Sequence, residues 1–505
     1  MDDLFLGIDV GTTATKTLLI NQSGEVITLA QQRYEIIPSH NTWVEQDPED
    51  WWDAVVKTVR KVVRGDETKK RIKGISLSTQ GGTLIPVDLE GKPLRKAITW
   101  LDQRAGKQGK SLEEKFGGDF FYSRTGYKPH SGLPLLYICW LKDNEPKVFE
   151  KTNKFLFVND YIIYKLTGKY YTDPSNASIT MLYNLKLRDW DERLLQIASI
   201  SRQKLSGIKD SGVPIGKLTN LAAKTINLSQ DVIVSSGGHD QYCSSLGSGA
   251  FGDGNCLVSC GTAWVLLFSR DRAIFDAKSN IIPGRHVIKD KWGAMATISC
   301  GGVVMEWFKN NFIGSYINNN KKKGDNIYDL YNKKAKDIPA GSNNLLFFPH
   351  FIGSTAPTWQ SSAKGGVIGL TLSHTKYDIF KSIMEGLGFE VLWNIEVIKD
   401  LGISIKRIKM IGGATKSNLW SQIIADITGE RIFVPFVTEA ACLGAAILAG
   451  VGGGVFKTPE EGFEKLQIKE KEIIPSQDNV SKYRKLFKVY KETFWKLQDS
   501  YRGLR

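Results

Sequence analysis

Cysteine is scarce in this chain, with six residues in 505. The six stand mostly in apolar, strand-like surroundings: Cys139, Cys243, Cys256, Cys260, Cys300 and Cys442. Cysteines in such places are typically small buried thiols, so we expect no disulfide framework. Cys256 and Cys260 lie four residues apart, but no second pair of cysteines or histidines stands near them, and we expect no zinc site either.

Long hydrophobic runs are also missing. No stretch approaches the roughly 18 apolar residues that cross a bilayer. The first residues lack the basic and apolar segments of a secretory signal peptide. We therefore expect a cytoplasmic protein with no membrane partner.

Neither sign of charge dominates strongly, with 67 Lys+Arg against 53 Asp+Glu and a formal net charge of +14. The basic residues are dispersed, and the densest run, Lys321–Lys323, stands in an asparagine-rich segment typical of a solvated loop. We expect no nucleic-acid partner, while a mild positive field suits an anionic nucleotide.

The chain does have the length and pattern of two α/β domains. A chain of 505 residues is too long for one core, and its 42% hydrophobic and 24% charged residues are typical of a globular protein. Segments typical of strands alternate with helical segments in both halves, which favours two domains around a central cleft. We place the first domain at residues 1–248 and the second at residues 249–505.

The first strand and turn, residues 4–13, carry the strongest local signal. An apolar run ends at Asp9, and a Gly-Thr-Thr turn at residues 11–13 precedes a second apolar run, as in a β-hairpin. Backbone N–H groups and threonine hydroxyls at this turn can face phosphate oxygens, and Gly7 and Gly11 permit a close approach of a ligand. Asp9 can hold Mg²⁺, which keeps only one or two protein carboxylates. The alternative is an ordinary hairpin that ends in an aspartate.

Residues 255–268 repeat this pattern of apolar strand, Gly-Thr turn and apolar strand, with Gly261 and Thr262 at the turn. Two similar halves would place two phosphate-binding hairpins on either side of one cleft. The repeat is weak as a sequence match, so it supports this interpretation without proving it.

Several other segments are predicted to place polar or glycine residues at a turn. Strands are predicted at residues 72–78, 99–104, 232–235 and 406–411, and Asp102 stands at the end of the second. Asp47 and Pro48 predict the start of a helix that runs to about Val63. Further helices are predicted at residues 133–141, 420–428 and 439–448, and a lysine-rich amphipathic helix closes the chain.

Together these segments resemble, in order along the chain, the FGGY family of carbohydrate kinases. The matching segments are residues 7–13, 43–48, 100–102, 238–241, 259–262 and 412–414. Residues 365–370, followed by 378–379 and 382–385, are similar to the C-terminal signature of the family. The N-terminal signature departs at Tyr137, where the family usually has lysine, which we interpret as a surface variation.

The resemblance implies an actin-like (ribonuclease H-like) fold of the sugar kinase, heat-shock chaperone and actin superfamily, whose two lobes close on MgATP and a small sugar or polyol. Asp240 matches the catalytic base, which accepts the proton of the attacking hydroxyl. Asp9 matches the Mg²⁺-linked aspartate. The residues that match the phosphate-binding turns and the nucleotide site are Gly11, Thr12, Thr13, Gly261, Thr262, Gly301, Gly302, Gly412, Gly413, Ala414, Ser417 and Asn418.

The same resemblance implies the sugar pocket, whose matching residues are Gln80, Gly81, Gly82, Asp102, Asp240 and Gln241. Asp102 also fits a helix cap before Gln103 and Arg104. We interpret His239 as a packed or surface histidine, because the sequence shows no carboxylate partner for it. We expect one of four tryptophans to stack on the sugar: Trp43, Trp51, Trp52 or Trp100.

The chain most resembles the xylulokinases of this family, which implies phosphorylation of a terminal hydroxyl of D-xylulose to give D-xylulose 5-phosphate. The departure is at Gly81 and Gly82, where typical xylulokinases carry Met-His. Two glycines are expected to leave room for a bulkier substrate or for water. Another ketopentose, a pentitol, gluconate or a deoxy-sugar are the alternative substrates, and a non-catalytic actin-like nucleotide-binding module is the alternative class. A homodimer is an open option for the assembly.

Overall fold

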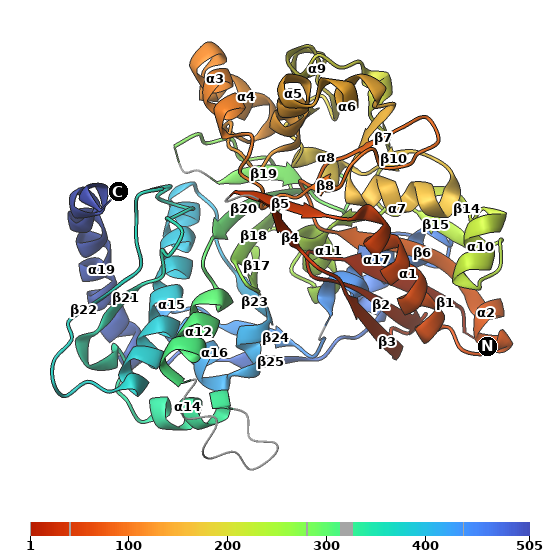
Figure 1. Cartoon of the computed structure of the whole chain (residues 1–505). Coiled ribbons are helices and arrows are strands. Elements are labelled where there is room, and N and C mark those ends of the chain that lie inside the picture. Colours follow the sequence, from red (N-terminus) through yellow and green to blue (C-terminus); the bar gives the residue numbers. More distant parts are fainter. Residues whose placement is uncertain (1, 40–41, 279–280, 314–326, 438, 505) are drawn as a thin grey trace.

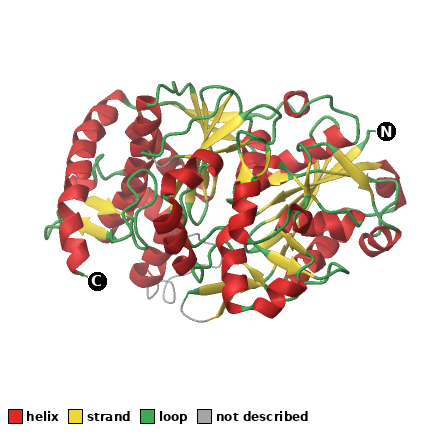
Figure 2. Ribbon diagram, turned by 90° about the horizontal axis from the view of Figure 1, so that it is seen from above, coloured by secondary structure: helices red, strands yellow, loops and turns green. Residues whose placement is uncertain are grey.

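The computed structural model describes residues 2–39, 42–278, 281–313, 327–437 and 439–504, and the lysine run at 321–323 lies outside them. Two seven-stranded sheets form its framework (Figure 1). Helices surround the sheets, and the two termini lie at opposite ends of the molecule (Figure 2). Among the described residues, none of the helices combines the length and the apolar character needed to cross a membrane.

The first sheet is built around the predicted N-terminal hairpin. β1 is antiparallel to β2, with Leu4 opposite Asn21 and Val10 opposite Thr15, and β1 is parallel to β6. The strands of this sheet are β14 (Pro214–Lys217), β15 (Ile233–Ser235), β6 (Ile72–Thr79), β1 (Leu4–Val10), β2 (Ala14–Asn21) and β3 (Val26–Arg33) in spatial order, and β16 (Gly238–His239) pairs with β6.

The second sheet is built around the predicted second hairpin. β17 is antiparallel to β18, with Cys260 opposite Trp264, and parallel to β23. The strands in spatial order are β19 (Ile282–Arg285), β20 (Trp292–Ile298), β18 (Trp264–Arg270), β17 (Asn255–Cys260), β23 (Arg407–Gly412), β24 (Ile432–Pro435) and β25 (Glu470–Ile473).

The two sheets repeat one topology. In each, a central strand has an antiparallel hairpin partner on one side and two strands parallel to it on the other: β1 with β2, β3, β6 and β15, and β17 with β18, β20, β23 and β24. The expected repeat of two halves is therefore present at the level of strand order, where the sequence match was weak.

The helices of the first half follow the predicted caps. Asp47 caps α1 through its side chain, Pro48 opens the helix, and Trp51 is fully buried on its inner face. The helices of this half are α1 (Pro48–Val62), α2 (Asp66–Arg71), α3 (Gly106–Phe116), α4 (Gly118–Thr125), α5 (Pro134–Asn144), α6 (Pro146–Lys151), α7 (Val158–Thr167), α8 (Pro174–Ser178), α9 (Glu192–Ala198), α10 (Asn220–Ile226) and α11 (Asp240–Ser248).

The helices of the second half include the predicted C-terminal amphipathic helix. They are α12 (Gly302–Phe308), α14 (Ile327–Lys336), α15 (Lys376–Asp400), α16 (Asn418–Thr428), α17 (Ala440–Gly452), α18 (Pro459–Lys465) and α19 (Gln477–Gly503). α19 buries Tyr483, Tyr490 and Phe494 against α15, and both helices lie on the left of Figure 1.

Helix α17 returns from the second half to the first sheet. It packs against β1 and β6, where a Cβ at Gly7 of β1 would be 1.9 Å from the carbonyl oxygen of Cys442. α17 also packs closely on α11, because a Cβ at Gly444 would be 2.0 Å from the carbonyl oxygen of Cys243. Gly7 is therefore required for helix packing, and the expectation that it lets a ligand approach is wrong.

Two smaller connections bear on the site. β4 (Ile37–Ser39), β5 (Trp43–Gln46) and β8 (Ala97–Ile98) form a small antiparallel sheet, and residues 99–104 follow it as a turn. The predicted strand at 99–104 is therefore wrong, because Asp102 N–H donates to the carbonyl oxygen of Thr99 and closes the chain into a turn. All six cysteines are free, and five are buried, as predicted.

Candidate active site

Asp9 lies at the end of β1, where the register places it beside Ser78 of β6. The Ser78 hydroxyl donates to Asp9 Oδ1 at 2.7 Å. Burial, and to a smaller extent the negative charge of Asp240, raises the pKa of Asp9 to about 7, against the opposing effects of Ser78 and Lys16. Asp9 and Asp240 are thus electrostatic neighbours, and a carboxylate in this state is suited to a divalent cation.

Asp240 is the first residue of α11 and follows the short strand β16 directly. Its side chain is about 30% exposed. Desolvation raises the pKa of Asp240 to about 6, against the opposing effect of the hydrogen bonds of Gln241. A carboxylate with this pKa is ionised at neutral pH and still basic enough to accept a proton, as a general base requires.

The turn at residues 11–13 connects Asp9 to the small sheet. The carbonyl oxygen of Thr12 accepts from Gln46 Nε2 at 2.7 Å, and its hydroxyl accepts from Trp100 Nε1 at 3.2 Å. A Cβ at Gly11 would meet only Ala14 O, at 3.3 Å, and Asp9 Oδ2, at 3.8 Å, so one side of this turn is open. The turn can therefore accept phosphate oxygens without rearrangement.

Gln80 is linked to this turn by hydrogen bonds through Gln46. Its Nε2 donates to Gln46 Oε1 at 2.9 Å, and the same Gln46 holds Thr12. The Gln80 side chain is buried, and its Oε1 has no hydrogen-bond partner within the described part of the chain. The structure thus places Gln80 behind the phosphate turn and next to the residues predicted for the sugar.

The space beside Gly81 is occupied. A Cβ at this position would lie 1.7 Å from Cδ1 of Ile179 and 2.6 Å from Cδ2 of His239. The expectation that Gly81 leaves room for a bulkier substrate is therefore wrong. Gly82 differs, because it has φ +69° and a Cβ there would be 3.3 Å from Cβ of Trp100.

Among the four candidate tryptophans, Trp100 is the one placed to touch a ligand. It is 41% exposed, adjoins Gly82 and donates to Thr12. Trp51 and Trp52 are buried in the core beneath α1, and Trp43 packs against Trp140 with a ring separation of 5.3 Å. Trp100 therefore contacts both the predicted sugar pocket, at Gly82, and the phosphate turn, at Thr12.

Asp102 is fully buried and engaged with the protein. Its Oδ1 accepts from the backbone N–H and Nε of Arg104, at 2.8 and 2.9 Å, and its Oδ2 accepts from Val44 N–H at 2.6 Å and Arg104 Nη2 at 2.8 Å. Among the described residues, no hydrogen bond or ion pair joins Asp102 to Asp240. The carbonyl oxygen of Asp102 accepts from the hydroxyl of Tyr137 at 3.0 Å, and Tyr137 is fully buried, so the interpretation of Tyr137 as a surface variation is wrong. The helix-cap alternative is wrong as well, because α3 begins after Ala105 with no side-chain cap.

His239 has the carboxylate partner that the sequence seemed to lack. Its Nε2 lies 3.3 Å from Oδ1 of Asp240, the next residue along the chain. The His239 side chain is only 10% exposed, so this is a packed histidine and not a surface one. Burial lowers its pKa to about 4, which keeps the ring neutral at neutral pH.

The second cluster surrounds the turn between β17 and β18. Gly302 N–H donates to the carbonyl oxygen of Gly261, and Gly301 N–H donates to that of Thr262, both at 2.9 Å. A Cβ at Gly301 would be 2.1 Å from Trp264, so only glycine permits this approach of α12. Gly261 and Thr262 remain exposed to solvent.

Gly412 and Gly413 lie beside this turn at the end of β23. Gly412 has φ +95°, and a Cβ there would be 2.6 Å from the carbonyl oxygen of Cys260, whereas a Cβ at Gly413 would be 3.8 Å from the same oxygen. Ser417 caps α16 and also donates to Asn332 at 3.0 Å, Asn418 accepts from Lys471 at 2.8 Å, and Ala414 is buried. Bare backbone at the two glycines can accept a nucleotide ring.

The predicted residues therefore form two clusters, one on each sheet. Within the described ranges, no hydrogen bond, ion pair or ring contact joins the two turns directly. Helix α11 connects them, because it begins at Asp240 and packs against β17 and β18. Sequence reasoning missed Ser78 and Gln46, which only strand pairing brings to Asp9 and Thr12.

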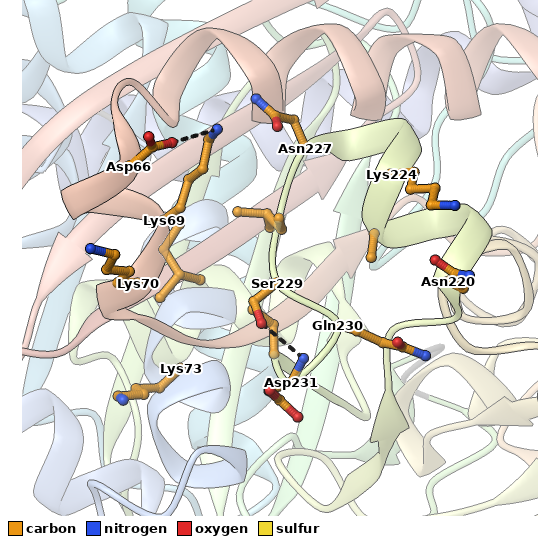
Figure 3. A pocket seen from close by; sticks show the side chains of 14 residues that line it. Asp66, Lys69, Lys70, Lys73, Asn220, Lys224, Asn227, Ser229, Gln230 and Asp231 are labelled. Atoms are coloured by element: carbon orange, nitrogen blue, oxygen red, sulfur yellow. Dashed lines mark hydrogen bonds and ion pairs between the residues drawn. The ribbon is translucent and has the colours of Figure 1, made fainter.

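One cavity lies far from both clusters, at the opposite end of the first sheet. It has a volume of about 790 Å³ and is bordered by the starts of β6 and β15 and by α2 and α10 (Figure 3). Lys69 pairs with Asp66 there, and Ser229 accepts from the backbone of Asp231. None of the predicted site residues lines this cavity, so it does not belong to the candidate site.

Comparison with known proteins agrees with this arrangement. Residues 4–247 match the N-terminal domain of the FGGY family of carbohydrate kinases, and residues 256–453 match the C-terminal domain. The chain belongs to the FGGY family of carbohydrate kinases. It is thus an ATP-dependent carbohydrate kinase that acts on a small-molecule sugar, and the alternative of a non-catalytic actin-like module is not supported.

Individual FGGY relatives differ in their substrates. The chain is 32% identical to a xylulose kinase of Bacillus subtilis (strain 168) over 496 residues, 98% of this chain and 97% of that protein. It is 29% identical to a gluconokinase of the same organism over 507 residues, 99% of this chain and 97% of that protein. The crystal structure of a ligand-bound xylulose kinase from Lactobacillus acidophilus has a TM-score of 0.91, with 27% identity and complete coverage of both chains.

Proposed function

We propose that this kinase transfers the γ-phosphoryl group of ATP to a terminal hydroxyl of D-xylulose, giving D-xylulose 5-phosphate. The observation that carries the proposal is the pair of carboxylates at Asp9 and Asp240, whose pKa values are both raised and which interact with each other. Similarity to xylulose kinases along almost the whole chain supports the choice of sugar. In this proposal residues 1–248 bind the sugar and residues 249–505 bind the nucleotide.

Each residue has a distinct role in the proposed reaction. Asp240 accepts the proton of the attacking sugar hydroxyl, because a neutral hydroxyl is a poor nucleophile. Asp9 holds Mg²⁺, and the turns at Thr12 and Thr262 hold phosphate oxygens through backbone N–H groups and hydroxyls. When bound, MgATP supplies the phosphoryl group and the neutralising charge.

The sugar is held by the residues around Asp240. Trp100 offers an exposed aromatic face beside Gly82. Gln241 has a buried Oε1 without a hydrogen-bond partner in the described residues, which suits a donor hydroxyl nearby. Because His239 and Ile179 fill the space beside Gly81, a sugar of ketopentose size is favoured over a bulkier substrate.

Charge argues against gluconate as the substrate. The predicted sugar pocket contains the carboxylate of Asp240, Asp9 lies near it as the predicted Mg²⁺ ligand, and the guanidinium of Arg104 is bound by Asp102 and Glu45. A sugar acid would therefore place a third carboxylate near two others, and Arg104 is already paired. A neutral ketose avoids this repulsion.

A coupled ADP-release assay with MgATP tests the proposal. The panel contains D-xylulose, L-xylulose, D- and L-ribulose, ribitol, erythritol, gluconate, L-fuculose and glycerol. We expect D-xylulose to give the highest kcat/KM and gluconate to give one lower by at least about tenfold, since discrimination depends on individual polar groups. A higher kcat/KM for any other compound would reject D-xylulose as the substrate, while ADP release with any of them would leave the kinase class intact.

A further inference from the structure

His239 lies between Gly81, which is predicted to line the sugar pocket, and Asp240, the predicted base. Its Nε2 lies 3.3 Å from Asp240 Oδ1 on one side. On the other side its ring occupies the place of a side chain at Gly81, where a Cβ would be 2.9 Å from Nε2. Its backbone N–H donates to the Ser175 hydroxyl at 2.9 Å, which fixes the backbone from which the ring extends. The imidazole therefore has little freedom to leave Asp240.

The chemistry of the ring suits a donor to a carboxylate. Burial keeps His239 neutral, so it carries one N–H. With that proton on Nε2 the ring can donate to Asp240 Oδ1, 3.3 Å away, once the carboxylate turns toward it. Nδ1 is buried and has no hydrogen-bond partner in the described part of the chain. The other carboxylate that acts on the ring, Asp173, is itself satisfied by Ser175 and Asn176. Asp240 is thus the partner that remains.

We propose that His239 is a positioning residue, which holds Oδ1 of Asp240 and leaves Oδ2 to accept the proton of the sugar hydroxyl. This inference rests on the proposed role of Asp240 as the base. A carboxylate that is partly exposed can otherwise rotate about its side-chain bonds, and a misplaced base loses much of its effect. Glycine at position 81 is needed for the same contact, because any side chain there would displace the imidazole from Asp240.

The protein offers a matched control in a second buried histidine that also contacts Tyr242. The ring of His239 lies 5.8 Å from that of Tyr242, and the ring of His286 lies 5.4 Å from it, both in edge-on contact. His286 is also buried, but it contacts Ser245 at 3.1 Å and accepts from Ile288 N–H, and no carboxylate lies beside it in the described residues. The two histidines share their packing and differ in their polar partner.

The experiment compares His239→Leu, His239→Gln and His286→Leu in the full chain. Thermal unfolding, ATP binding, and kcat and KM for the best sugar of the panel are measured for each. We expect His239→Leu to lower kcat by about tenfold or more, as for a lost partner of a catalytic group, with ATP binding unchanged. His239→Gln, whose amide can still donate, should recover most of kcat. His286→Leu should lower the unfolding temperature and leave kcat within about twofold.

Three results overturn the inference. They are a wild-type kcat in His239→Leu, equal losses of kcat in His239→Leu and His239→Gln at similar stability, and an equal loss in His286→Leu. The Asp240→Asn variant separates this failure from that of the proposed function. If Asp240→Asn is inactive while His239→Leu is fully active, the base stands and the positioning role is rejected, whereas an active Asp240→Asn enzyme rejects the base itself.

Discussion

The two sheets have the same strand order but different chemistry at their central hairpins. In the first, β1 ends in Asp9, and Asp240 comes to lie near it from α11. In the second, β17 ends in Cys260, and glycines from α12 and β23 surround the turn at Gly261. One fold unit thus carries the carboxylates of the site, and the other carries exposed backbone.

In the function proposed above, this difference matches what each half would bind. A proton acceptor and a metal ligand need ionisable oxygens, and burial tunes their pKa values. A nucleotide ring needs close contact with backbone, which glycine allows because it has no Cβ. The repeated scaffold supplies the turn, and a few side chains at its edge decide which ligand it suits.

Buried carboxylates also occur in the second half, but in another place. Glu390 of α15 accepts from Tyr490 of α19 at 2.7 Å and lies 3.5 Å from His350, far from the hairpin turn in the sequence. Burial raises the pKa of Glu390 to about 7. Both halves therefore hold carboxylates that are costly to ionise, and only those of the first half adjoin the predicted ligands.

The largest effect is expected at Asp240. Asp240→Asn removes the proton acceptor and should lower kcat by at least about 10²-fold, since general base catalysis typically contributes this much or more. ATP binding, measured by calorimetry, should stay near the wild-type value because the residues predicted to hold the nucleotide ring lie on the other sheet. Retained turnover would show that the carboxylates of the first half are structural, like Glu390, and would remove the contrast between the halves.

A smaller effect is expected at Gly412 in the second half. Gly412→Ala places a Cβ against the carbonyl of Cys260 at a φ of +95°, and such strain is of order 1–3 kcal/mol. We expect the KM for ATP to rise by about tenfold while the KM for the sugar changes little. Gly402→Ala is the control, because Gly402 also has a positive φ, +78°, but has no atom within 4 Å of its Cβ. Equal effects on both KM values would contradict the division of binding between the sheets.

The smallest effect on turnover is expected at Glu390, where the change is in stability. The folded protein keeps Glu390 protonated up to about pH 7, while the unfolded chain ionises it near 4.5. Stability from this group is therefore lost as the pH rises from about 4.5 to 7, because only the unfolded chain releases the proton. The free energy of unfolding of Glu390→Gln, relative to that of the wild type, should be higher at pH 8 than at pH 5 by on the order of 3 kcal/mol.

Chemical unfolding at the two pH values measures this difference, and kcat at pH 8 should be unchanged by Glu390→Gln. A constant difference in unfolding free energy between mutant and wild type would mean that burial does not perturb Glu390. A large loss of kcat would connect this carboxylate to the site, which the comparison of the halves does not allow.

The motif residues and most elements were predictable from the sequence. Apolar runs that end in Gly-Thr turns predicted both hairpins, and Asp47 and Pro48 predicted the start of α1. These features depend on neighbouring residues, so local pattern is enough to predict them. The prediction for residues 99–104 failed because hydrogen bonds with a segment far away in the sequence, from Val44 N–H to Asp102 and from Arg104 to Glu45, override its strand-like composition.

The sequence alone thus determined the family, the two hairpins and the candidate base, because motif order and local periodicity survive without knowledge of contacts. Tertiary structure decided the environment of each residue. Packing filled the space beside Gly81 with His239, bound Asp102 to Arg104, and turned Gly7 into a contact for α17. Those outcomes depend on which distant segments meet at a few ångströms, and residue type alone does not specify such contacts.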